Sequence, residues 1–123
     1  MNVDRLSRKS LEKILGGQVK EKATCVVKFY SNSCPFCSNL KDYFEDIAKE
    51  EGYSDLHFFA FNVDDYPSIE DRMKFNGVPT ISLIKARPGK HRSRFRIMPD
   101  PDSPNPHTWY SVGEIKKFIE REK

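Results

Sequence analysis

The cysteine pair in Cys34-Pro35-Phe36-Cys37 limits the possible folds more than any other feature, because of what stands on either side of it. The preceding run, residues 24–30, is apolar at nearly every position, which is typical of a strand buried on both faces of an α/β sheet. From Pro35 onward, apolar residues recur at helical spacing. The sequence therefore predicts both sulfurs at a turn that leads from a central strand into a helix.

The spacing of the two cysteines also predicts their chemistry. If Cys34 is the N-cap residue, Pro35 occupies the first helical position, where a missing N–H costs nothing. Cys37 then lies on the same face, one turn further in. The free backbone N–H groups of Phe36 and Cys37, together with the positive end of the helix dipole, favour a thiolate at Cys34. We therefore predict Cys34 as the nucleophile and Cys37 as the resolving thiol.

A Cys-x-x-Cys pair has two other interpretations, half of a zinc site or a structural pair. Tetrahedral zinc needs two further ligands, and the sequence has no second cysteine pair. Its histidines, His57, His91 and His107, are scattered and lack ligand spacing. We expect a redox-active pair that uses no metal and no other cofactor. The third cysteine, Cys25, begins the apolar strand and is interpreted as a buried, small apolar residue.

The length and composition favour one small domain. The 123 residues are enough for a single core, so residues 1–123 are expected to form one domain. No apolar run approaches the roughly 18 residues of a membrane span, and residues 1–6 lack the apolar core of a signal peptide. An odd number of cysteines argues against a secreted fold held together by disulfides. We expect a monomer in the cytoplasm, with no membrane partner.

The remaining segments alternate between strand and helix periodicity. Strands are predicted at residues 2–6, 24–30, 56–63, 81–84 and 92–97, and helices at residues 7–15, 35–51, 68–76 and 111–119. The resulting order is β-α-β-α-β-α-β-β-α, which is an α/β fold. Ligands of open α/β sheets bind at the carboxyl ends of strands, and the cysteine pair is predicted near such an edge.

A second segment near that edge is Val78-Pro79, which follows a glycine turn and leads into a buried strand. A proline in such a place is where a cis peptide bond occurs. A cis bond would leave the backbone groups of Val78 unpaired and available to a ligand.

Three features together make the chain resemble the thioredoxin superfamily over nearly all of its length. They are the strand at 26–30 before the cysteine pair, the strand end at 61–64 and the segment at 77–80. The step from the second cysteine to the proline of the last segment is also close to that of thioredoxins. The resemblance implies a thioredoxin fold, in which helices flank a central mixed sheet.

The resemblance also implies roles for the matching residues. In thioredoxins the first cysteine attacks a substrate disulfide, the second resolves the mixed disulfide, and the cis-proline loop pairs with the substrate backbone. Carried over, these roles fall to Cys34, to Cys37, and to Val78 with Pro79. Between the cysteines, Pro35-Phe36 looks like a glutaredoxin and is expected to contact substrate, although the glutathione site of glutaredoxins is not visible. The implied activity is thiol-disulfide exchange on protein disulfides, with a reductase that recycles the pair.

Lys28, six residues before Cys34, departs from the family pattern. Thioredoxins usually have a buried Asp there, and the lysine that pairs with that Asp corresponds to Ala60 in this chain. Two interpretations stay open: Lys28 faces an edge with its stem reaching water, or it lies beneath the cysteines as a catalytic cation. In the second case it stabilises a thiolate, and a lowered pKa lets its neutral amine accept a proton. A disulfide more oxidising than that of an ordinary thioredoxin would follow.

The predicted hairpin at 85–96 is strongly basic. It contains no acid, and its six cations are Lys85, Arg87, Lys90, Arg92, Arg94 and Arg96. The formal net charge of +3 depends on them, so the rest of the chain is net acidic. The hairpin is either a solvated edge that charge protects from strand pairing, or a docking surface for an acidic partner protein or a nucleic acid. On the docking interpretation, the protein is a redox-independent interaction module.

Residues 98–106 hold four of the eight prolines and are predicted as an irregular, extended loop. Two interpretations stay open for this loop. With Trp109 it rims the cysteine pair, or it is a surface insertion and Trp109 is packed in the core.

Overall fold

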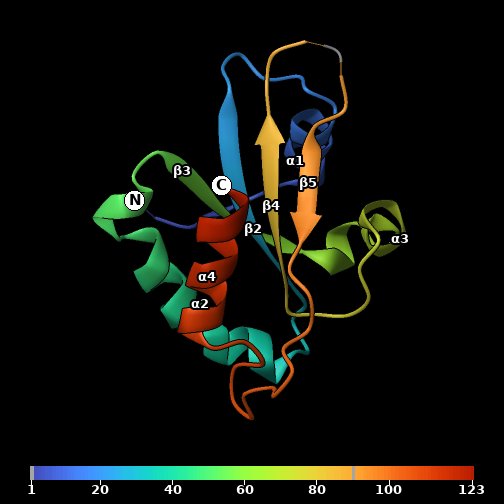
Figure 1. Ribbon diagram of the computed structural model, residues 1–123. Coiled ribbons are helices and arrows are strands. Elements are labelled where there is room, and N and C mark those ends of the chain that lie inside the picture. Colours follow the sequence, from blue (N-terminus) through green and yellow to red (C-terminus); the bar gives the residue numbers. More distant parts are fainter. Residues whose placement is uncertain (1, 90) are drawn as a thin grey trace.

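A five-stranded sheet forms the centre of the protein in the computed structural model, which describes residues 2–89 and 91–123 (Figure 1). Its strands are β1 (Asp4–Arg5), β2 (Ala23–Tyr30), β3 (Leu56–Asn62), β4 (Thr80–Ala86) and β5 (Arg94–Ile97). The order across the sheet is β1-β3-β2-β4-β5. The first three of these run parallel, whereas β4 is antiparallel to β2 and β5 is antiparallel to β4. The predicted α/β fold is confirmed, and its sheet is mixed.

Helices cover both faces of this sheet. They are α1 (Arg8–Leu15), α2 (Pro35–Ala48), α3 (Ile69–Met73) and α4 (Val112–Glu122). α2 and α4 lie together on one face, and α1 and α3 lie on the other (Figure 1). The element order is the one that the sequence predicts. Over the described ranges, no helix is both long enough and apolar enough to cross a membrane.

β2 separates two apolar cores, because its side chains point alternately to the two faces. Val26 lies in the core beneath α2 and α4, with Phe44 and Ile115. Val27 and Phe29 lie in the core beneath α1 and α3. All five side chains are fully buried. This two-sided burial is the reason why β2 is apolar at nearly every position.

Two helices end earlier than the periodicity predicts. α2 stops before residue 51, because the N–H groups of Lys49 and Glu50 bond to carbonyls three residues back and tighten its last turn. α3 stops at Lys74, which has a left-handed φ of 62°, and not at the predicted Asn76-Gly77. Neither end changes the position of the cysteine pair, which lies at the opposite end of α2.

Candidate functional site

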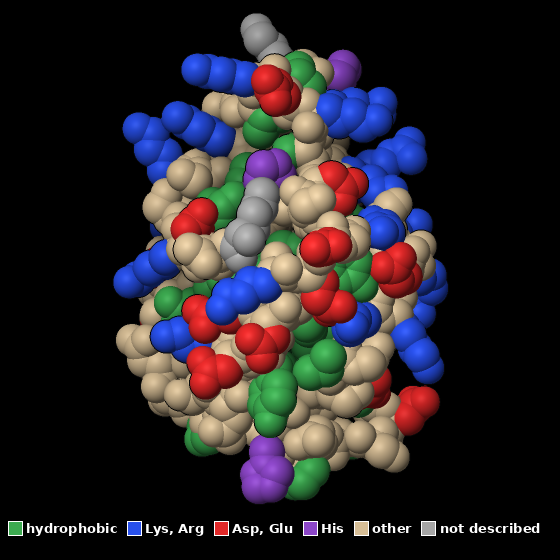
Figure 2. Space-filling model, turned by 90° about the vertical axis from the view of Figure 1, so that its left-hand side faces the viewer, with side chains coloured by type: hydrophobic (Ala, Val, Ile, Leu, Met, Phe, Trp, Pro, Cys, Tyr) green, Lys and Arg blue, Asp and Glu red, His purple; other side chains and the backbone are tan. Residues whose placement is uncertain are grey.

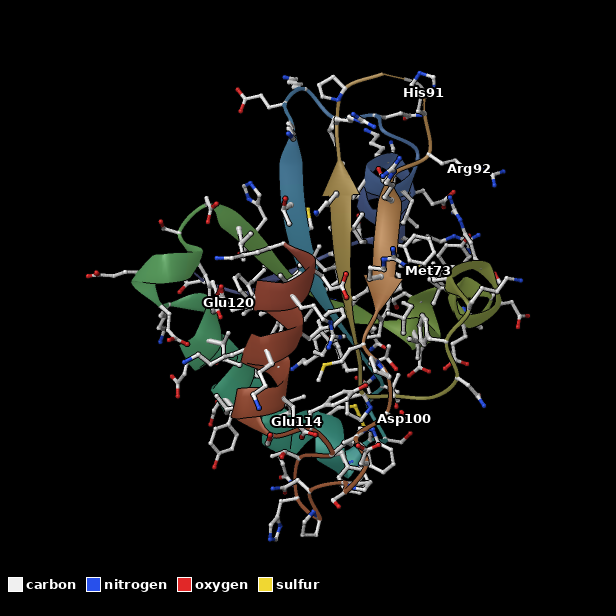
Figure 3. All side chains as sticks on the ribbon, in the orientation of Figure 1. Met73, His91, Arg92, Asp100, Glu114 and Glu120 are labelled. Atoms are coloured by element: carbon white, nitrogen blue, oxygen red, sulfur yellow. A yellow bond between two sulfur atoms is a disulfide. The ribbon has the colours of Figure 1, made fainter. Side chains whose placement is uncertain are left out.

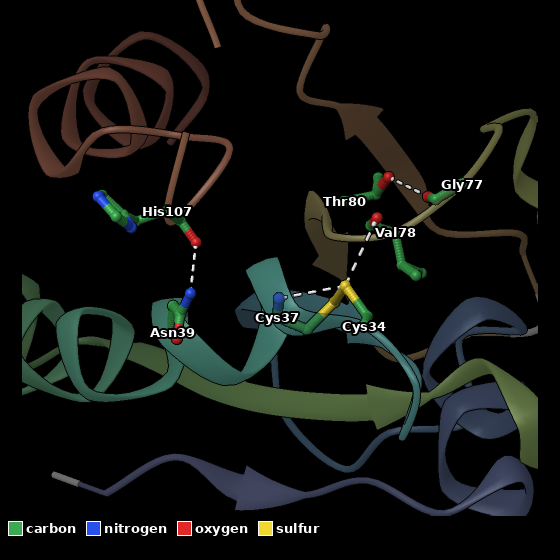
Figure 4. The surroundings of a disulfide bond; sticks show 7 residues. All are labelled: Cys34, Cys37, Asn39, Gly77, Val78, Thr80 and His107. Atoms are coloured by element: carbon green, nitrogen blue, oxygen red, sulfur yellow. Dashed lines mark hydrogen bonds between the residues drawn. A yellow bond between two sulfur atoms is a disulfide. The ribbon is translucent and has the colours of Figure 1, made fainter. Parts of the chain in front are cut away.

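The two cysteines form a disulfide at the start of α2, directly after β2 (Figure 4). Cys34 is the N-cap residue and Pro35 is the first helical residue, as the spacing predicts. The backbone N–H of Cys37 donates to the Cys34 sulfur across 3.1 Å. The backbone N–H of Phe36, which was predicted as a second donor, makes no hydrogen bond to the Cys34 sulfur among the described residues. The donor and the helix dipole together stabilise negative charge on Cys34.

The two sulfurs differ in their access to solvent. Cys34 is half-buried, whereas Cys37 is 3% exposed and lies further inside on α2. An incoming disulfide therefore meets the Cys34 sulfur first. The arrangement suits attack from outside at Cys34 and a second, internal step by Cys37.

A loop far along the sequence lies against Cys34. The Cys34 sulfur is 3.7 Å from the carbonyl oxygen of Val78 (Figure 4), and the Val78-Pro79 peptide bond is cis. The hydroxyl of Thr80 donates to the carbonyl of Gly77 across 2.7 Å, which closes the turn before β4. The structure thus brings the predicted substrate-binding pair and the disulfide together at one end of the sheet.

Lys28 lies beneath the cysteine pair and not at an edge of the sheet. It is 4% exposed, and it lines a cavity of about 370 Å³ together with Cys34 and Cys37. The alternation of β2 puts it on the same face as Val26, against α2. Its partner in register on β3 is Ala60, as the resemblance implies. The interpretation of Lys28 as an edge-facing lysine is therefore wrong.

The surroundings of Lys28 change its acidity. Burial lowers the pKa of its amine from the ordinary 10.5 to about 8; the Glu45 carboxylate opposes this shift and the Lys41 ammonium adds to it. The Nζ atom lies 5.5 Å from the centre of the Phe44 ring. An amine with such a pKa has both protonation states within reach near neutral pH, so it suits proton transfer.

The loop before α4 forms one rim of the site. The ring of Trp109 lies 5.6 Å from that of Phe36, and the side-chain amide of Asn39 donates to the carbonyl of His107 across 2.8 Å (Figure 4). Trp109 also packs against the core beneath α2 and α4. For Trp109, both interpretations therefore hold in part. Sequence reasoning missed Asn39, because nothing in the sequence marks its bond to a backbone carbonyl 68 residues away.

Cys25 takes no part in this site. It is 3% exposed and lies on the other face of β2, in the core beneath α1 and α3. Burial raises the pKa of its thiol to about 11. The prediction of a buried cysteine that behaves as an apolar residue is confirmed.

The basic hairpin lies at the other end of the sheet. In register, Lys85 is paired with Thr24 at the start of β2, whereas the disulfide follows the end of that strand. Figure 3 shows His91 and Arg92 far from Asp100 at the opposite end of the molecule. The exposed hairpin cations are Lys85, Arg87, Arg92, Arg94 and Arg96, and the sixth, Lys90, lies outside the described residues. The structure does not bring the hairpin and the disulfide together.

Comparison with known protein families shows which family the chain belongs to. The family model described as Thioredoxin matches residues 6–96, a range that holds β2, the cysteine pair and the Val78-Pro79 turn. The chain belongs to the thioredoxin family. Its disulfide has the spacing of a Cys-x-x-Cys motif, with a separation of 3 in the sequence. A thioredoxin-family domain with such a pair supports a redox enzyme that exchanges thiols and disulfides.

Solved thioredoxin structures share the fold at low sequence identity. The thioredoxin Mala s 13 of Malassezia sympodialis is 14% identical, with a TM-score of 0.66 over 97% of this chain and 89% of that one. Chloroplastic thioredoxin z is 20% identical, with a TM-score of 0.64 over 98% and 94%. The Trx4 domain of ERdj5 is 18% identical, with a TM-score of 0.65 over 98% and 94%. The likeness confirms the thioredoxin fold predicted for this chain.

A zinc site at the cysteine pair would need further ligands close to the two sulfurs. Within residues 2–89 and 91–123, no group of three or more His, Cys, Asp or Glu side chains is placed to hold a metal ion.

Proposed function

We propose that this thioredoxin-family protein is a thiol-disulfide oxidoreductase that reduces protein disulfides through Cys34 and Cys37. The unequal placement of the two sulfurs carries the proposal. Cys34 is half-buried at the start of a helix, with an N–H donor 3.1 Å from its sulfur, whereas Cys37 is 3% exposed. The Cys34 sulfur is accessible to a substrate, and the Cys37 sulfur is within reach of Cys34.

The exchange proceeds in two steps. In the reduced protein, the Cys34 thiolate attacks one sulfur of a substrate disulfide, so that a protein–substrate S–S bond forms and the second substrate sulfur leaves as a thiolate that takes up a proton. Cys37 then loses its proton and attacks the Cys34 sulfur. The mixed disulfide breaks, the first substrate sulfur leaves as a thiolate, and the Cys34–Cys37 disulfide remains. Two electrons pass from the protein to its substrate, and a reductase must return them.

The substrate segment is proposed to lie between Val78 and Phe36. The Val78 carbonyl is 3.7 Å from the Cys34 sulfur, so a peptide that carries the attacked sulfur runs beside this backbone and beside Pro79. Phe36, backed by the ring of Trp109, and the exposed Pro35 supply an apolar wall on the other side. A protein disulfide next to apolar residues fits these surroundings.

Lys28 is proposed to act in the second step. It shares a cavity with both cysteines, and the pKa of its amine is about 8, so a useful fraction is neutral and able to accept the Cys37 proton. In its protonated form the same amine stabilises a thiolate in that cavity. Lys28 therefore serves the site in both of its charge states.

Trapping of the mixed disulfide tests the proposal. Cys37→Ser is expected to hold a covalent complex with insulin, because no thiol remains beside Cys34 to resolve it, and Cys34→Ser is expected to hold none. Non-reducing electrophoresis and mass spectrometry identify the complex. Cys25→Ser is the matched control and should reduce insulin at the wild-type rate with dithiothreitol as reductant. Equal trapping by Cys34→Ser would contradict the assignment of the nucleophile, and no insulin reduction by the wild type would contradict the function.

A further inference from the structure

Exposed cations form a continuous band around one end of the sheet and along β5. Two adjoining grooves, of about 240 and 640 Å³, are lined by these side chains and share Lys85 and Arg94. We call this surface the basic band, and its members are Lys22, Lys85, Arg87, Arg92, Arg94, Arg96, Arg121 and Lys123. Glu122 is the single acid that lines it within the described residues. The band carries more positive charge than the whole chain, whose formal net charge is +3.

The charges of the band are only partly balanced within the protein, where Lys123 pairs with Glu120 across 3.2 Å. Glu122 lies 3.1 Å from Arg121 and 3.8 Å from Arg96, but over the described ranges no carboxylate is within 4 Å of Lys85 or Arg94. These two residues stand directly opposite each other in the β4–β5 pair. Like charges in such a cross-strand pair destabilise a sheet. An anion bound between them would remove that cost.

Acidic side chains gather elsewhere. Figure 2 shows the side of the molecule that carries β3 and α2, away from β5, and there Asp and Glu side chains collect around the middle of the face. Lys and Arg side chains lie among these acids, so that face carries charge of both signs, whereas the described lining of the basic band holds a single acid, Glu122. A surface of one predominant sign orients and attracts a partner of opposite charge over long range.

The hairpin is held in place, so its cations are arranged before any partner binds. The backbone N–H of Ser93 donates to the carbonyl of Leu15 across 2.8 Å, and its hydroxyl donates to the carbonyl of Ile14. Gly17, with φ 72°, packs against the hairpin so closely that a Cβ atom would lie 2.7 Å from the carbonyl oxygen of Gly89. A surface that is ordered in the free protein loses less entropy on binding.

β5 also presents an open edge. It is the last strand of the sheet in the part of the chain that the structure describes. Since the N–H of Met98 donates to Ile81, the alternation of an antiparallel ladder points the backbone groups of Phe95 and Ile97 away from β4. The exposed residues Arg94 and Arg96 flank them on one face. An added strand with an acid at every second position would form hydrogen bonds with these backbone groups and ion pairs with the two arginines.

We propose that the basic band binds an acidic, extended segment of a partner protein, which adds to the edge of β5. The open edge is the observation that favours a peptide, because a nucleic acid has no backbone pattern that matches it. Phe95, the only Phe, Tyr or Trp among the described lining residues, packs towards the core beneath α1 and α3 and is not free to stack on bases. This binding uses neither sulfur and lies at the end of β2 opposite to the disulfide.

Fluorescence anisotropy with a labelled peptide of alternating Glu and Thr tests the proposal. The wild-type protein is expected to bind this probe in about 0.1 M salt, with an affinity that falls as the salt concentration rises. Arg92→Glu/Arg94→Glu should weaken binding roughly tenfold or more. The matched control, Lys9→Glu/Lys49→Glu, makes the same change in net charge away from the band and should change the affinity by less than about twofold. On binding, hydrogen exchange of the Phe95 and Ile97 amides should slow.

Three results would overturn the proposal: no binding of the acidic peptide, equal weakening by the control, or unchanged exchange of the two β5 amides in the bound state. A duplex DNA of similar charge is measured beside the peptide, and tighter binding of the DNA with the same dependence on Arg92 and Arg94 would assign the band to nucleic acid instead. The Cys34→Ser/Cys37→Ser form is expected to bind the peptide as the wild type does, which separates this inference from the exchange activity.

Discussion

Lys28 stands directly opposite Ala60 in the parallel register of β2 and β3, and both side chains line the cavity beneath the disulfide. Ala60 offers no charge to the buried amine. While Cys34 and Cys37 are oxidised, the acid that lines this cavity with Lys28 is Glu45. Reduction to a thiolate adds a second negative charge, so the charge balance of the cavity depends on the redox state of the sulfurs.

Replacing Lys28 with methionine should make the reduced site less acidic. Lys28→Met removes the cation and keeps the length of the side chain, so we expect the pKa of the Cys34 thiol to rise by roughly 1 unit. A less stable thiolate makes the disulfide less oxidising, by roughly 30 mV. Thiolate absorbance measured against pH gives the first quantity, and equilibration in glutathione buffers gives the second.

Lys41→Met is the control for that experiment. Lys41 lines the same cavity but is exposed to solvent, which screens its charge. Its removal should shift the Cys34 pKa by less than about 0.3 units. The proposed role of Lys28 fails if both variants shift the thiol equally, or if Lys28→Met shifts neither the pKa nor the potential.

The stability of the oxidised protein should rise with pH just above neutrality. Burial lowers the folded-state pKa of Lys28 to about 8 from 10.5, so the unfolded chain binds more protons between these values and stability increases with pH. From pH 8 to pH 9 the gain is about 1 kcal/mol. From about pH 8 the buried Cys25 contributes in the opposite direction, because its unfolded thiol, with the ordinary pKa of 9.0, ionises before the folded one, whose pKa is about 11.

Urea denaturation at a series of pH values measures this dependence. The difference in the free energy of unfolding between the wild type and Lys28→Met isolates the lysine, because Cys25 is present in both. That difference should change by about 1 kcal/mol between pH 8 and pH 9. A difference that stays constant over this interval would show that the folded-state pKa of Lys28 is not lowered.

Cys25 should be unreactive in the folded protein. A thiol with a pKa of about 11 and 3% exposure is ionised to only roughly 0.1% at pH 8 and is shielded from reagents. Iodoacetamide is therefore expected to modify Cys34 in the reduced protein and to leave Cys25 free, whereas in urea all of the cysteines react. Peptide mass spectrometry gives the sites. Rapid labelling of Cys25 under native conditions would mean that the core beneath α1 opens readily.

Gly17 should be the least replaceable glycine. Gly17→Ala places a Cβ atom against the hairpin carbonyls at a left-handed φ of 72°, so we expect a loss of at least about 2 kcal/mol in the free energy of unfolding. Gly113→Ala is the matched control, since no atom lies within 4 Å of its added Cβ and helix α4 favours alanine. It should stabilise the protein by about 0.5 kcal/mol. Urea denaturation compares the two, and similar values for both would contradict the close packing of Gly17.

The fold and the cysteine turn were predictable because each has a local signal. Two-sided burial makes residues 24–30 apolar throughout, and Pro35 after Cys34 marks the helix start. The placement of Lys28 had no such signal. The alternation of side chains along β2 puts Lys28 on the same face as Val26, but the sequence does not tell which face of the strand α2 covers. Trp109 was equally hard to place, because its φ of 68° is one that a bulky residue rarely adopts, and its partners are the backbone of Asn105 and the ring of Phe36.

The length of β2 sets the distance between the basic band and the disulfide. Six steps of about 3.3 Å separate Thr24, beside Lys85, from Tyr30, so the level of Thr24 is about 20 Å from the end of β2, where the turn that carries Cys34 begins. A partner that docks an acidic segment on the basic band and offers a disulfide to Cys34 at the same time needs about six extended residues or more between them. We expect partners with shorter connections to engage one end at a time, so that spacing along the partner chain would select among substrates.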